Sequence, residues 1–522
     1  MHIIVTMAGH SRRFAAAGLK GPKWLLPVGG KPMIADVVEM FSQNDTFHFV
    51  LNREQLNDNP TLSEILTNLA PHALIHVIEP HELGPTYTAL QASGIGDDEP
   101  VIVTYCDFTV QWDYEAFLRH VHGADGAVVS FRGFHPASFG TTYYAYMRTS
   151  GDRMLELREK KSFTDDRANE PASTGIYYFA KWALFRRYGE RLLAAENREL
   201  PEAYVSLLFN PMVADQLTVL VHDVEHFVCL GTPEDYDQHE FWWRYFHSEQ
   251  APCPEPSDIS TINLVPMAGR GSRFRDYGYR VAKPLIQVRG ERMVLRTLAS
   301  LPEAHKWIFL LRTQDLGRHP IERALREFAP DCTVIAVDHD TSGQAATCLL
   351  ATDQLDPASG LLITSSDYEH RYNVAEWNDV LRDPSIDGAI WTYRMGAGLV
   401  KNPMAFAYCR TEPDGRVLEV VEKRTISDNP GDDPLVVGTF WYRRSADFVW
   451  SATRMIERGI TVNGEHYVGT SINQLIEAGK RFVIFDIEQW ISFGDPFELK
   501  VLEFWEGYFA KKDAAALPEN IR

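Results

Sequence analysis

Long hydrophobic runs are missing from this 522-residue sequence, and its longest apolar stretches, such as residues 213–221, are interrupted by polar residues. A membrane-spanning helix needs about 20 consecutive apolar residues, so none is predicted. Cysteine is also scarce, and the six cysteines form no CxxC pair, which argues against a disulfide scaffold and a zinc cluster. The first residues lack the basic and apolar regions of a signal peptide, so a cytoplasmic location is expected.

Positive charge is in short supply, because 51 Lys and Arg stand against 71 Asp and Glu and give a net charge of −20. Nucleic acids and anionic membranes bind basic surfaces, so neither is an expected partner. The overall composition is that of an ordinary globular protein, with 45% hydrophobic and 23% charged residues. Basic residues nonetheless gather locally, since residues 7–31 contain five of them and no acidic residue.

The sequence contains one long internal repeat. Residues 7–14, MAGHSRRF, reappear as residues 267–274, MAGRGSRF, an offset of 260. Lys23 and Asp107 recur at the same offset as Lys283 and Asp367, and later matches lie 263 residues apart. This pattern predicts two homologous domains, residues 1–248 and residues 262–522, which are joined by a proline-rich linker over residues 249–261.

Short β-rich runs alternate with helical patterns in each copy. In the first copy the runs cover residues 3–6, 47–51, 74–78, 101–104 and 127–131. In the second copy they cover residues 262–266, 307–311, 333–337, 361–364 and 388–392. Strands separated by helix-length segments indicate βαβ units, so the predicted fold class is α/β with a mainly parallel central sheet in each domain. Ligands of such sheets bind at the carboxyl ends of the strands.

The loop after the first strand of each copy is a predicted phosphate site. It contains glycine, which lets backbone N–H groups approach a phosphate, and it contains an Arg and a Lys ten residues later, which neutralise phosphate oxygens. A P-loop is excluded because Gly30-Lys31 is followed by Pro32, and Phe274 stands where a dinucleotide fingerprint needs its third glycine. A solvated basic turn is the alternative interpretation, and the duplicated Arg-to-Lys spacing favours the phosphate site.

The combined motif resembles the nucleotidyltransferases that make nucleotide-activated sugars. It consists of Met-Ala-Gly-x-x-x-Arg-Phe, then Pro22-Lys23 or Lys283-Pro284, and then LPVGGKPMI at residues 26–34. The resemblance spans both copies and looks closest to short capsule or surface-polysaccharide members. It implies two tandem Rossmann-like (GT-A-like) domains that transfer NMP from an NTP to a phosphorylated sugar or polyol, release pyrophosphate and serve surface polysaccharide precursor synthesis. The base could be that of a cytidylyl-, guanylyl-, uridylyl- or thymidylyltransferase.

The resemblance also implies a role for each matching residue. Arg13 and Arg273 would hold the leaving pyrophosphate, and Lys23 and Lys283 would hold the α-phosphate. The nucleotide would contact Ala8, Gly9, Gly84, Ala268, Gly269, Gly271 and Gly343. The acceptor would contact Glu159, Lys160, Gly175, Glu422, Lys423 and Gly438. Asp107 and Asp367, which follow strands, would hold Mg²⁺ against substrate phosphates, although an Asp after a strand also occurs as a simple turn residue.

Several points stay open in the sequence. The family's second metal ligand is replaced by Cys229 and Ser492, so the metal would rest on one Asp or also involve Asp223 and Asp486. A glycosyltransferase acting on an NDP-sugar is an alternative function, because residues 367–369 (DYE) are a variant of its D-x-D pair. In another alternative one copy is catalytic and the other is a regulatory or binding domain, with Ser11 in place of a loop glycine. Homo-oligomerisation is left open.

Overall fold

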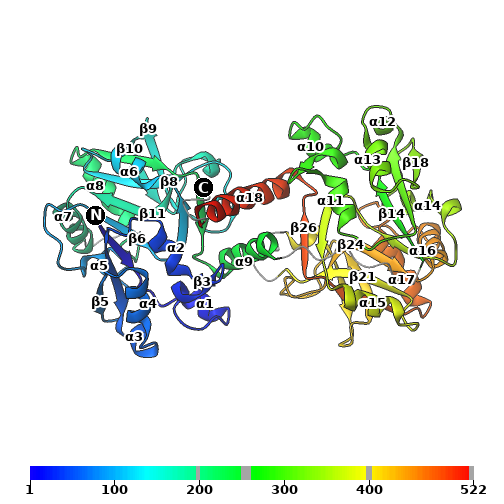
Figure 1. Ribbon diagram of the computed structural model, residues 1–522, viewed down its shortest axis with the longest axis horizontal. Helices are drawn as coiled ribbons and strands as arrows, with labels where there is room; N and C mark the ends of the chain where they lie inside the picture. The colour runs from blue at the N-terminus through cyan, green and yellow to red at the C-terminus, as the bar shows by residue number, and fades with distance from the viewer. Residues whose placement is uncertain (196–199, 249–259, 396–401, 517–522) are drawn as a thin grey trace. The chain divides into compact units, whose positions relative to one another are not determined.

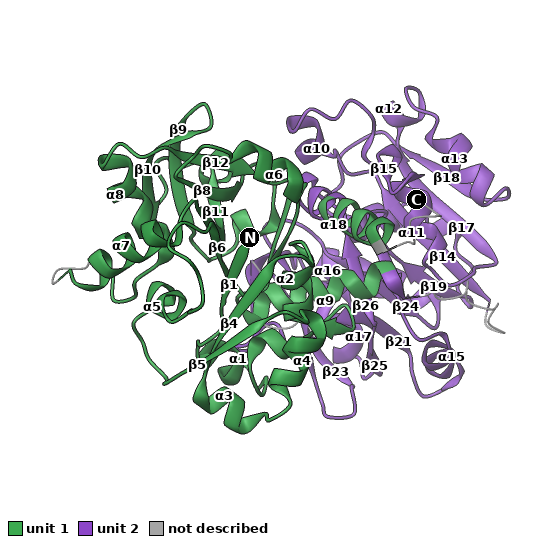
Figure 2. Ribbon diagram, turned by 60° about the vertical axis from the view of Figure 1, so that its left-hand side comes forward, with its two compact units in different colours: residues 1–246, 504–522 green, residues 247–503 purple. Residues whose placement is uncertain are grey.

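The computed structural model describes residues 1–195, 200–248, 260–395 and 402–516, which form two compact units (Figure 1). Unit 1 comprises Met1–Phe246 together with Phe504–Arg522, and unit 2 comprises His247–Glu503 (Figure 2). The predicted linker over residues 249–261 lies outside the described residues except for its last two positions. Among the described helices, none has the length and apolar character needed to cross a membrane.

Unit 1 is built on a nine-stranded sheet with the order β5-β4-β1-β6-β11-β8-β12-β10-β9. Strands β5, β4, β1 and β6 are parallel neighbours, whereas β11 runs antiparallel to both β6 and β8. The strand bounds are β1 (His2–Thr6), β4 (Thr46–Asn52), β5 (Leu74–Ile78), β6 (Val101–Tyr105), β8 (Gly126–Phe131), β9 (Ala145–Ser150), β10 (Arg153–Glu159), β11 (Ala172–Phe179) and β12 (Val219–Asp223).

Unit 2 repeats this arrangement with the order β18-β17-β14-β19-β24-β21-β25, and a further pair, β22 and β23, joins through β24. Strand β24 is the antiparallel counterpart of β11. The strand bounds are β14 (Thr261–Met267), β17 (Lys306–Arg312), β18 (Thr333–Val337), β19 (Gly360–Ile363), β21 (Gly388–Tyr393), β22 (Ala407–Thr411), β23 (Val417–Glu422), β24 (Leu435–Tyr442) and β25 (Phe482–Asp486). The α/β fold in two tandem domains, with parallel central strands, is therefore confirmed.

Helices cover both faces of each sheet, as buried parallel strands require. The alternation in β1 shows this directly, because Ile3 and Val5 enter one hydrophobic cluster and Ile4 enters another. The helices of the first repeat are α1 (Arg12–Ala16), α2 (Met33–Glu39), α3 (Arg53–Asp58), α4 (Leu62–Leu69), α5 (Pro85–Leu90), α6 (Tyr114–His120), α7 (Trp182–Leu193), α8 (Phe209–Ala214) and α9 (Pro233–His247). Those of the second are α10 (Ser272–Asp276), α11 (Met293–Ala299), α12 (Thr313–Leu316), α13 (Ile321–Phe328), α14 (Gln344–Leu349), α15 (Val374–Arg382), α16 (Ser445–Glu457), α17 (Val468–Glu477) and α18 (Pro496–Ala516).

The boundary between the two units falls inside the last helix, α18, and not at the boundary of the sequence repeat. Its residues from Phe504 onward belong to unit 1. Within that unit, the rings of Trp505, Tyr508 and Phe509 lie 5.4–6.2 Å from the ring of the fully buried His239 on α9. Lys512 Nζ lies 2.8 Å from an oxygen of the buried Asp36 on α2. Packing thus assigns this segment to unit 1, whereas the repeat counts it with the second copy.

Candidate active site

The basic loop of the first copy links β1 to α1 and has the same backbone geometry as its counterpart in the second copy. Ser11 has φ 51° and Gly271 has φ 57°, both in the left-handed region. A serine in this region is strained, but the Ser11 hydroxyl accepts a hydrogen bond from the Lys23 backbone N–H at 3.1 Å. The side chain therefore supports the loop conformation that glycine adopts freely in the second copy.

A Lys–Asp ion pair marks the centre of each predicted site. Lys23 Nζ contacts Asp107 Oδ2, and Lys283 Nζ contacts Asp367 Oδ2 in the same way. Burial is the largest single influence and would lower the pKa of Lys23, but the charge and hydrogen bond of Asp107, together with the neighbouring Cys106 and Cys229, raise that pKa to about 12. Because β1 and β6 are adjacent parallel strands, the loops at their carboxyl ends bring these two residues together.

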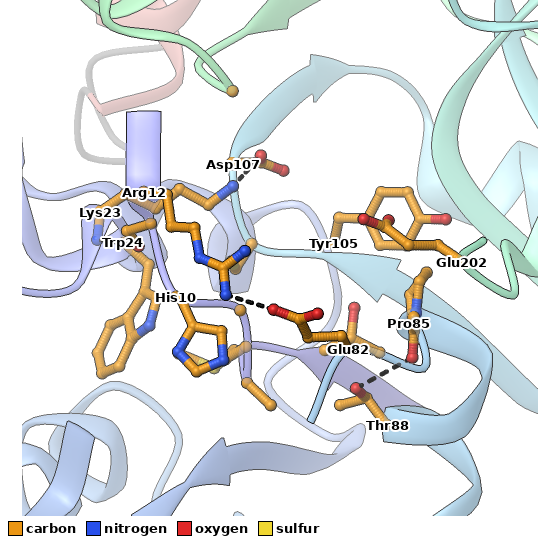
Figure 3. Close-up of a pocket in the computed structure, with 18 of the residues that line it drawn as sticks. His10, Arg12, Lys23, Trp24, Glu82, Pro85, Thr88, Tyr105, Asp107 and Glu202 are labelled. Atoms are coloured by element: carbon orange, nitrogen blue, oxygen red, sulfur yellow. Dashed lines mark hydrogen bonds and ion pairs between the residues drawn. The ribbon is translucent and has the colours of Figure 1, made fainter. Parts of the chain in front are cut away.

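A cavity of about 640 Å³ opens around this pair in the first copy. The predicted residues that line it are Ala8, Gly9, Arg13, Lys23, Gly84 and Asp107. Figure 3 shows Lys23 and Asp107 pointing toward one another in this cavity, with Arg12 paired to Glu82 at another part of the wall. The structure therefore brings these predicted residues of the first copy around one common space.

A second cavity, of about 190 Å³, adjoins the first, since Arg13, Tyr105, Asp107 and Tyr204 line both. It gathers the predicted acceptor residues Glu159, Lys160 and Gly175. The Lys160 ammonium donates a hydrogen bond to the Tyr204 hydroxyl at 2.6 Å, and burial raises the pKa of Glu159. A phosphorylated acceptor in this space would lie beside the Lys23–Asp107 pair.

The predicted acceptor residues of the second copy have a similar setting, but the Lys423 ammonium donates its hydrogen bond to the Ala405 backbone carbonyl rather than to a tyrosine hydroxyl. Lys423 has φ 55°, close to the 56° of Lys160, and its ammonium lies 5.7 Å from the ring centre of Tyr467, the counterpart of Tyr204. Glu422 ends β23, and burial raises its pKa to about 7. Arg273 Nη1 lies 3.4 Å from Asp495 Oδ2, at the start of α18.

Two of the predicted glycine pairs are explained by close approach of other groups. A Cβ on Gly84 would lie 2.5 Å from Ala203 N, and one on Gly343 would lie 2.5 Å from His466 N. A Cβ on Gly175 would lie 2.9 Å from the Tyr105 ring, and one on Gly438 would lie 3.2 Å from the Tyr368 ring. All four have φ between 86° and 134°, where glycine is favoured. In the basic loop, a Cβ on Gly9 or Gly269 would meet nothing within 4 Å, and one on Gly271 would lie 3.4 Å from Lys283 Cβ.

The space in front of each Asp is kept open by a further glycine. A Cβ on Gly231 would lie 3.1 Å from Asp107 Oδ2, and one on Gly494 would lie 2.9 Å from Asp367 Oδ2. Among the described residues, no three His, Cys, Asp or Glu side chains form a self-contained metal cage. One carboxylate with a glycine in front of it suits Mg²⁺, which keeps water and substrate phosphates as ligands and commonly uses only one or two carboxylates.

The other acidic residues that the sequence offered as possible metal ligands form ion pairs with arginines. Asp223 pairs with Arg132 at 2.7 Å, and Asp486 pairs with Arg394 at 3.0 Å. Glu369 pairs with Arg296 at 2.6 Å, so the carboxylate that would complete a D-x-D variant is engaged in an ion pair.

Sequence reasoning missed a second carboxylate near each Asp that was predicted to hold the metal. These are Asp235 and Glu498, which lie 263 residues apart in the first turns of α9 and α18. Burial raises the pKa of both, and the charges of Asp107 and Asp367 respectively raise it further. Ser492, at the position of the family's second ligand, donates a hydrogen bond to Glu498 at 2.7 Å. The repeat offset was the signal that could have identified this pair.

Comparison with known proteins agrees with this geometry. Residues 3–169 match the MobA-like NTP transferase domain, and residues 263–496 match the Nucleotidyl transferase family. The chain therefore belongs to the nucleotidyltransferases, as two such domains in tandem. More particularly, its homologues are sugar-phosphate nucleotidyltransferases. One relative, from Sulfolobus acidocaldarius, bears the name "Putative mannose-1-phosphate guanyltransferase" and is 26% identical over 208 residues, which cover 39% of this chain and 54% of that relative.

Two solved structures can be superposed on this chain, and each covers about half of it. The nucleoside-diphosphate-sugar pyrophosphorylase from Vibrio cholerae RC9 is 21% identical, with 47% of this chain and 99% of that chain covered and a TM-score of 0.38. The inositol-1-phosphate CTP transferase from T. maritima is 14% identical, with 48% and 96% covered and a TM-score of 0.37.

Proposed function

We propose that each copy transfers a nucleoside monophosphate from an NTP to a phosphorylated sugar or polyol and releases pyrophosphate. The observation that carries this proposal is the Lys–Asp pair that occurs in both copies, beside a basic loop and at the carboxyl ends of central strands. The named activity of the Sulfolobus relative supports a sugar phosphate as the acceptor.

The reaction brings two anions together. An oxygen of the acceptor phosphate attacks the α-phosphorus, the bond from that phosphorus to the oxygen bridging to the β-phosphate breaks, and pyrophosphate leaves with the electron pair. Such a transfer depends on positioning and charge stabilisation and needs no covalent intermediate on the protein. In this proposal Lys23 and Lys283 stabilise charge on the α-phosphate, and Arg13 and Arg273 hold the leaving pyrophosphate.

The acceptor side is proposed to use the Glu–Lys pairs. In the first copy, Lys160 provides positive charge for the acceptor phosphate and is oriented by its hydrogen bond to Tyr204. Glu159 lies in the same cavity, where a buried carboxylate can accept a hydrogen bond from an acceptor hydroxyl. Lys423 and Glu422 take these roles in the second copy.

Mg²⁺ is the proposed cofactor of both sites. Asp107 and Asp367 would hold it, Gly231 and Gly494 leave it room, and Asp235 and Glu498 lie near enough to influence its ligands. When bound, the ion would neutralise negative charge on the substrate phosphates.

The motif resemblance to capsule-type enzymes supports a role in making precursors of a surface polysaccharide, in the cytoplasm. The activity itself is tested by incubating the full-length protein with Mg²⁺, a sugar phosphate and an NTP labelled separately at the α- and γ-phosphates. The α-label is expected in the nucleotide-linked product and the γ-label in pyrophosphate. Release of a nucleoside diphosphate from an NDP-sugar, with no pyrophosphate from any NTP, would instead show a glycosyltransferase.

A further inference from the structure

Corresponding positions in the two acceptor sites are identified by matching hydrogen bonds. Leu157 N donates to Asn210 Oδ1 at 2.8 Å, and Val420 N donates to Asn473 Oδ1 at the same distance. Glu159 lies two residues after Leu157 on β10, and Glu422 lies two residues after Val420 on β23. Ser206 and Gly469 each lie four residues before the Asn, so they occupy equivalent places.

Strand pairing gives the correspondence on the other wall. In the first copy Ser173 pairs with Ser130 and Tyr177 with Val128. In the second copy Val436 pairs with Thr392 and Phe440 with Ile390, and both ladders shift register at this place. Ser173 and Tyr177 are therefore replaced by Val436 and Phe440.

Hydroxyl groups dominate this wall in the first copy. Ser173 and Tyr177 line the acceptor cavity together with Thr174, and the Ser173 hydroxyl donates a hydrogen bond to Tyr177 Oη at 3.0 Å. The Ser206 hydroxyl donates a hydrogen bond to the Glu159 carboxylate. These groups form an adaptable set of donors and acceptors around the Glu159 carboxylate.

The same wall is apolar in the second copy. A Cβ on Gly469 would lie 2.6 Å from Glu422 Oε1, 3.1 Å from Val420 Cγ1 and 3.5 Å from Phe440 Cε1, so these four residues meet at one point. Glycine has no hydroxyl to replace that of Ser206. Among the described residues, none donates a hydrogen bond to the Glu422 carboxylate.

This exchange changes which acceptor each site favours. A ligand hydroxyl that faces Ser173 and Tyr177 gains hydrogen-bond partners, whereas one that faces Val436 and Phe440 loses water without replacement. A buried carboxylate without a protein donor is stabilised when the ligand supplies one.

We propose that the two copies take different acceptors, an inference that rests on the proposed function. The first copy takes a fully hydroxylated sugar or polyol phosphate. The second takes a sugar or polyol phosphate that lacks a hydroxyl on the face toward Val436 and Phe440 and donates another hydroxyl to Glu422. The residues that set this specificity are Ser173, Tyr177 and Ser206 in the first copy and Val436, Phe440 and Gly469 in the second.

The test uses the full-length protein with one copy silenced at a time, by Lys283→Ala to observe the first copy and by Lys23→Ala to observe the second. Pyrophosphate release is measured with a panel of hexose 1-phosphates and their monodeoxy analogues. Sites built to bind a hydroxyl reject the analogue that lacks it by about 10⁴-fold, whereas apolar pockets discriminate by about 10²-fold or less. We expect kcat/KM of the first copy to fall by more than about 100-fold on at least one deoxy analogue, and that of the second copy to fall less than about tenfold or to rise on the same analogue.

Exchange variants tie this difference to the named residues. Tyr177→Phe removes one oxygen with little change of shape and should move the preference of the first copy toward that of the second, and Phe440→Tyr should do the reverse. Thermal unfolding checks each variant, and Ser206→Gly replaces Tyr177→Phe if the latter does not fold. Equal preference of both silenced proteins across the panel would overturn the inference and leave the proposed function standing. Absence of pyrophosphate release from either copy with every acceptor would overturn both.

Discussion

Two parts of the repeat have diverged to very different degrees. The basic loops keep the same left-handed turn and the same Lys–Asp contact, although one loop has Ser11 where the other has Gly271. On one face of the sheet, by contrast, the first copy carries a row of histidines, with ring nitrogens of His2, His48 and His76 lying 2.9 and 3.0 Å apart. Strand register places isoleucines at the equivalent positions of the second copy, namely Ile262, Ile308 and Ile335. The geometry of the predicted phosphate loops has been kept, whereas this face of the sheet has changed from histidine to isoleucine.

The largest expected effect tests whether the two loops are functionally equal. Lys23→Ala should lower turnover at the first site, and Lys283→Ala turnover at the second, by about 10²–10³-fold each, because each variant removes one preorganised charge from the transition state. The double variant should have almost no activity. Pyrophosphate release from each full-length variant measures this. If Lys23→Ala retains full turnover with every acceptor while Lys283→Ala has none, the first copy is not catalytic.

Next in size is the effect of filling the tight turn that both copies share. Gly84→Ala should destabilise the first unit by about 3 kcal/mol or more, because the added Cβ would lie 2.5 Å from the Ala203 backbone at φ 96°. Gly343→Ala should act alike in the second unit. Gly30→Ala is the matched control, since its φ is 86° but nothing lies within 4 Å of the added Cβ, and it should cost only about 1 kcal/mol. Denaturant unfolding that gives equal losses for Gly84→Ala and Gly30→Ala would contradict this explanation.

The histidine row should contribute to the acid sensitivity of the first unit. Burial, followed by the charges of His2 and His76, lowers the pKa of His48 to about 4 from 6.5. Between these values the unfolded chain binds more protons than the folded one, so stability falls as pH decreases from 6.5 to 4. The loss attributable to His48 is on the order of 2 kcal/mol, after allowance for partial solvent screening.

His48→Ile places the second copy's residue in the first copy and should remove this loss. Unfolding midpoints of wild type and variant, measured in parallel from pH 7 to pH 4, test the assignment. The second unit, with Ile308 at this position, is the internal control and should respond equally in both proteins. If wild type and variant lose stability in parallel, the acid sensitivity of the first unit arises elsewhere.

The smallest expected effect concerns Ser11. Ser11→Gly relieves left-handed strain but also removes the hydrogen bond to Lys23 N, and each term is about 1 kcal/mol. The NTP affinity of the first site should therefore change less than about threefold, as measured by calorimetry with Lys283→Ala in the background. A gain of tenfold or more would show that Ser11 weakens the first site relative to the second.

The elements that could be read from the sequence are those with local signals. The ten predicted strands are all present, because short apolar runs between helical segments determine βαβ units locally. Lys23 and Asp107 both follow predicted parallel strands, and in the structure they form an ion pair. Strand β11 between β6 and β8 was not foreseen, since its antiparallel pairing depends on partners far away in the sequence.

Contacts between side chains across the site could not be predicted from the sequence for the same reason. Ser206 meets Glu159 only because α8 and the turn before it pack against β10. The contacts of α18 with α9 involve residues more than 260 positions apart. Periodicity and motif spacing carry no information on such contacts.

The proposed function requires two working nucleotide sites in one chain. Equilibrium titration of the full-length protein with its preferred NTPs in the presence of Mg²⁺ tests this claim most directly. We expect two NTP molecules bound per wild-type chain, with weakening of one site in Lys23→Ala and of the other in Lys283→Ala. A wild-type stoichiometry of one, abolished by Lys283→Ala and unaffected by Lys23→Ala, would contradict it.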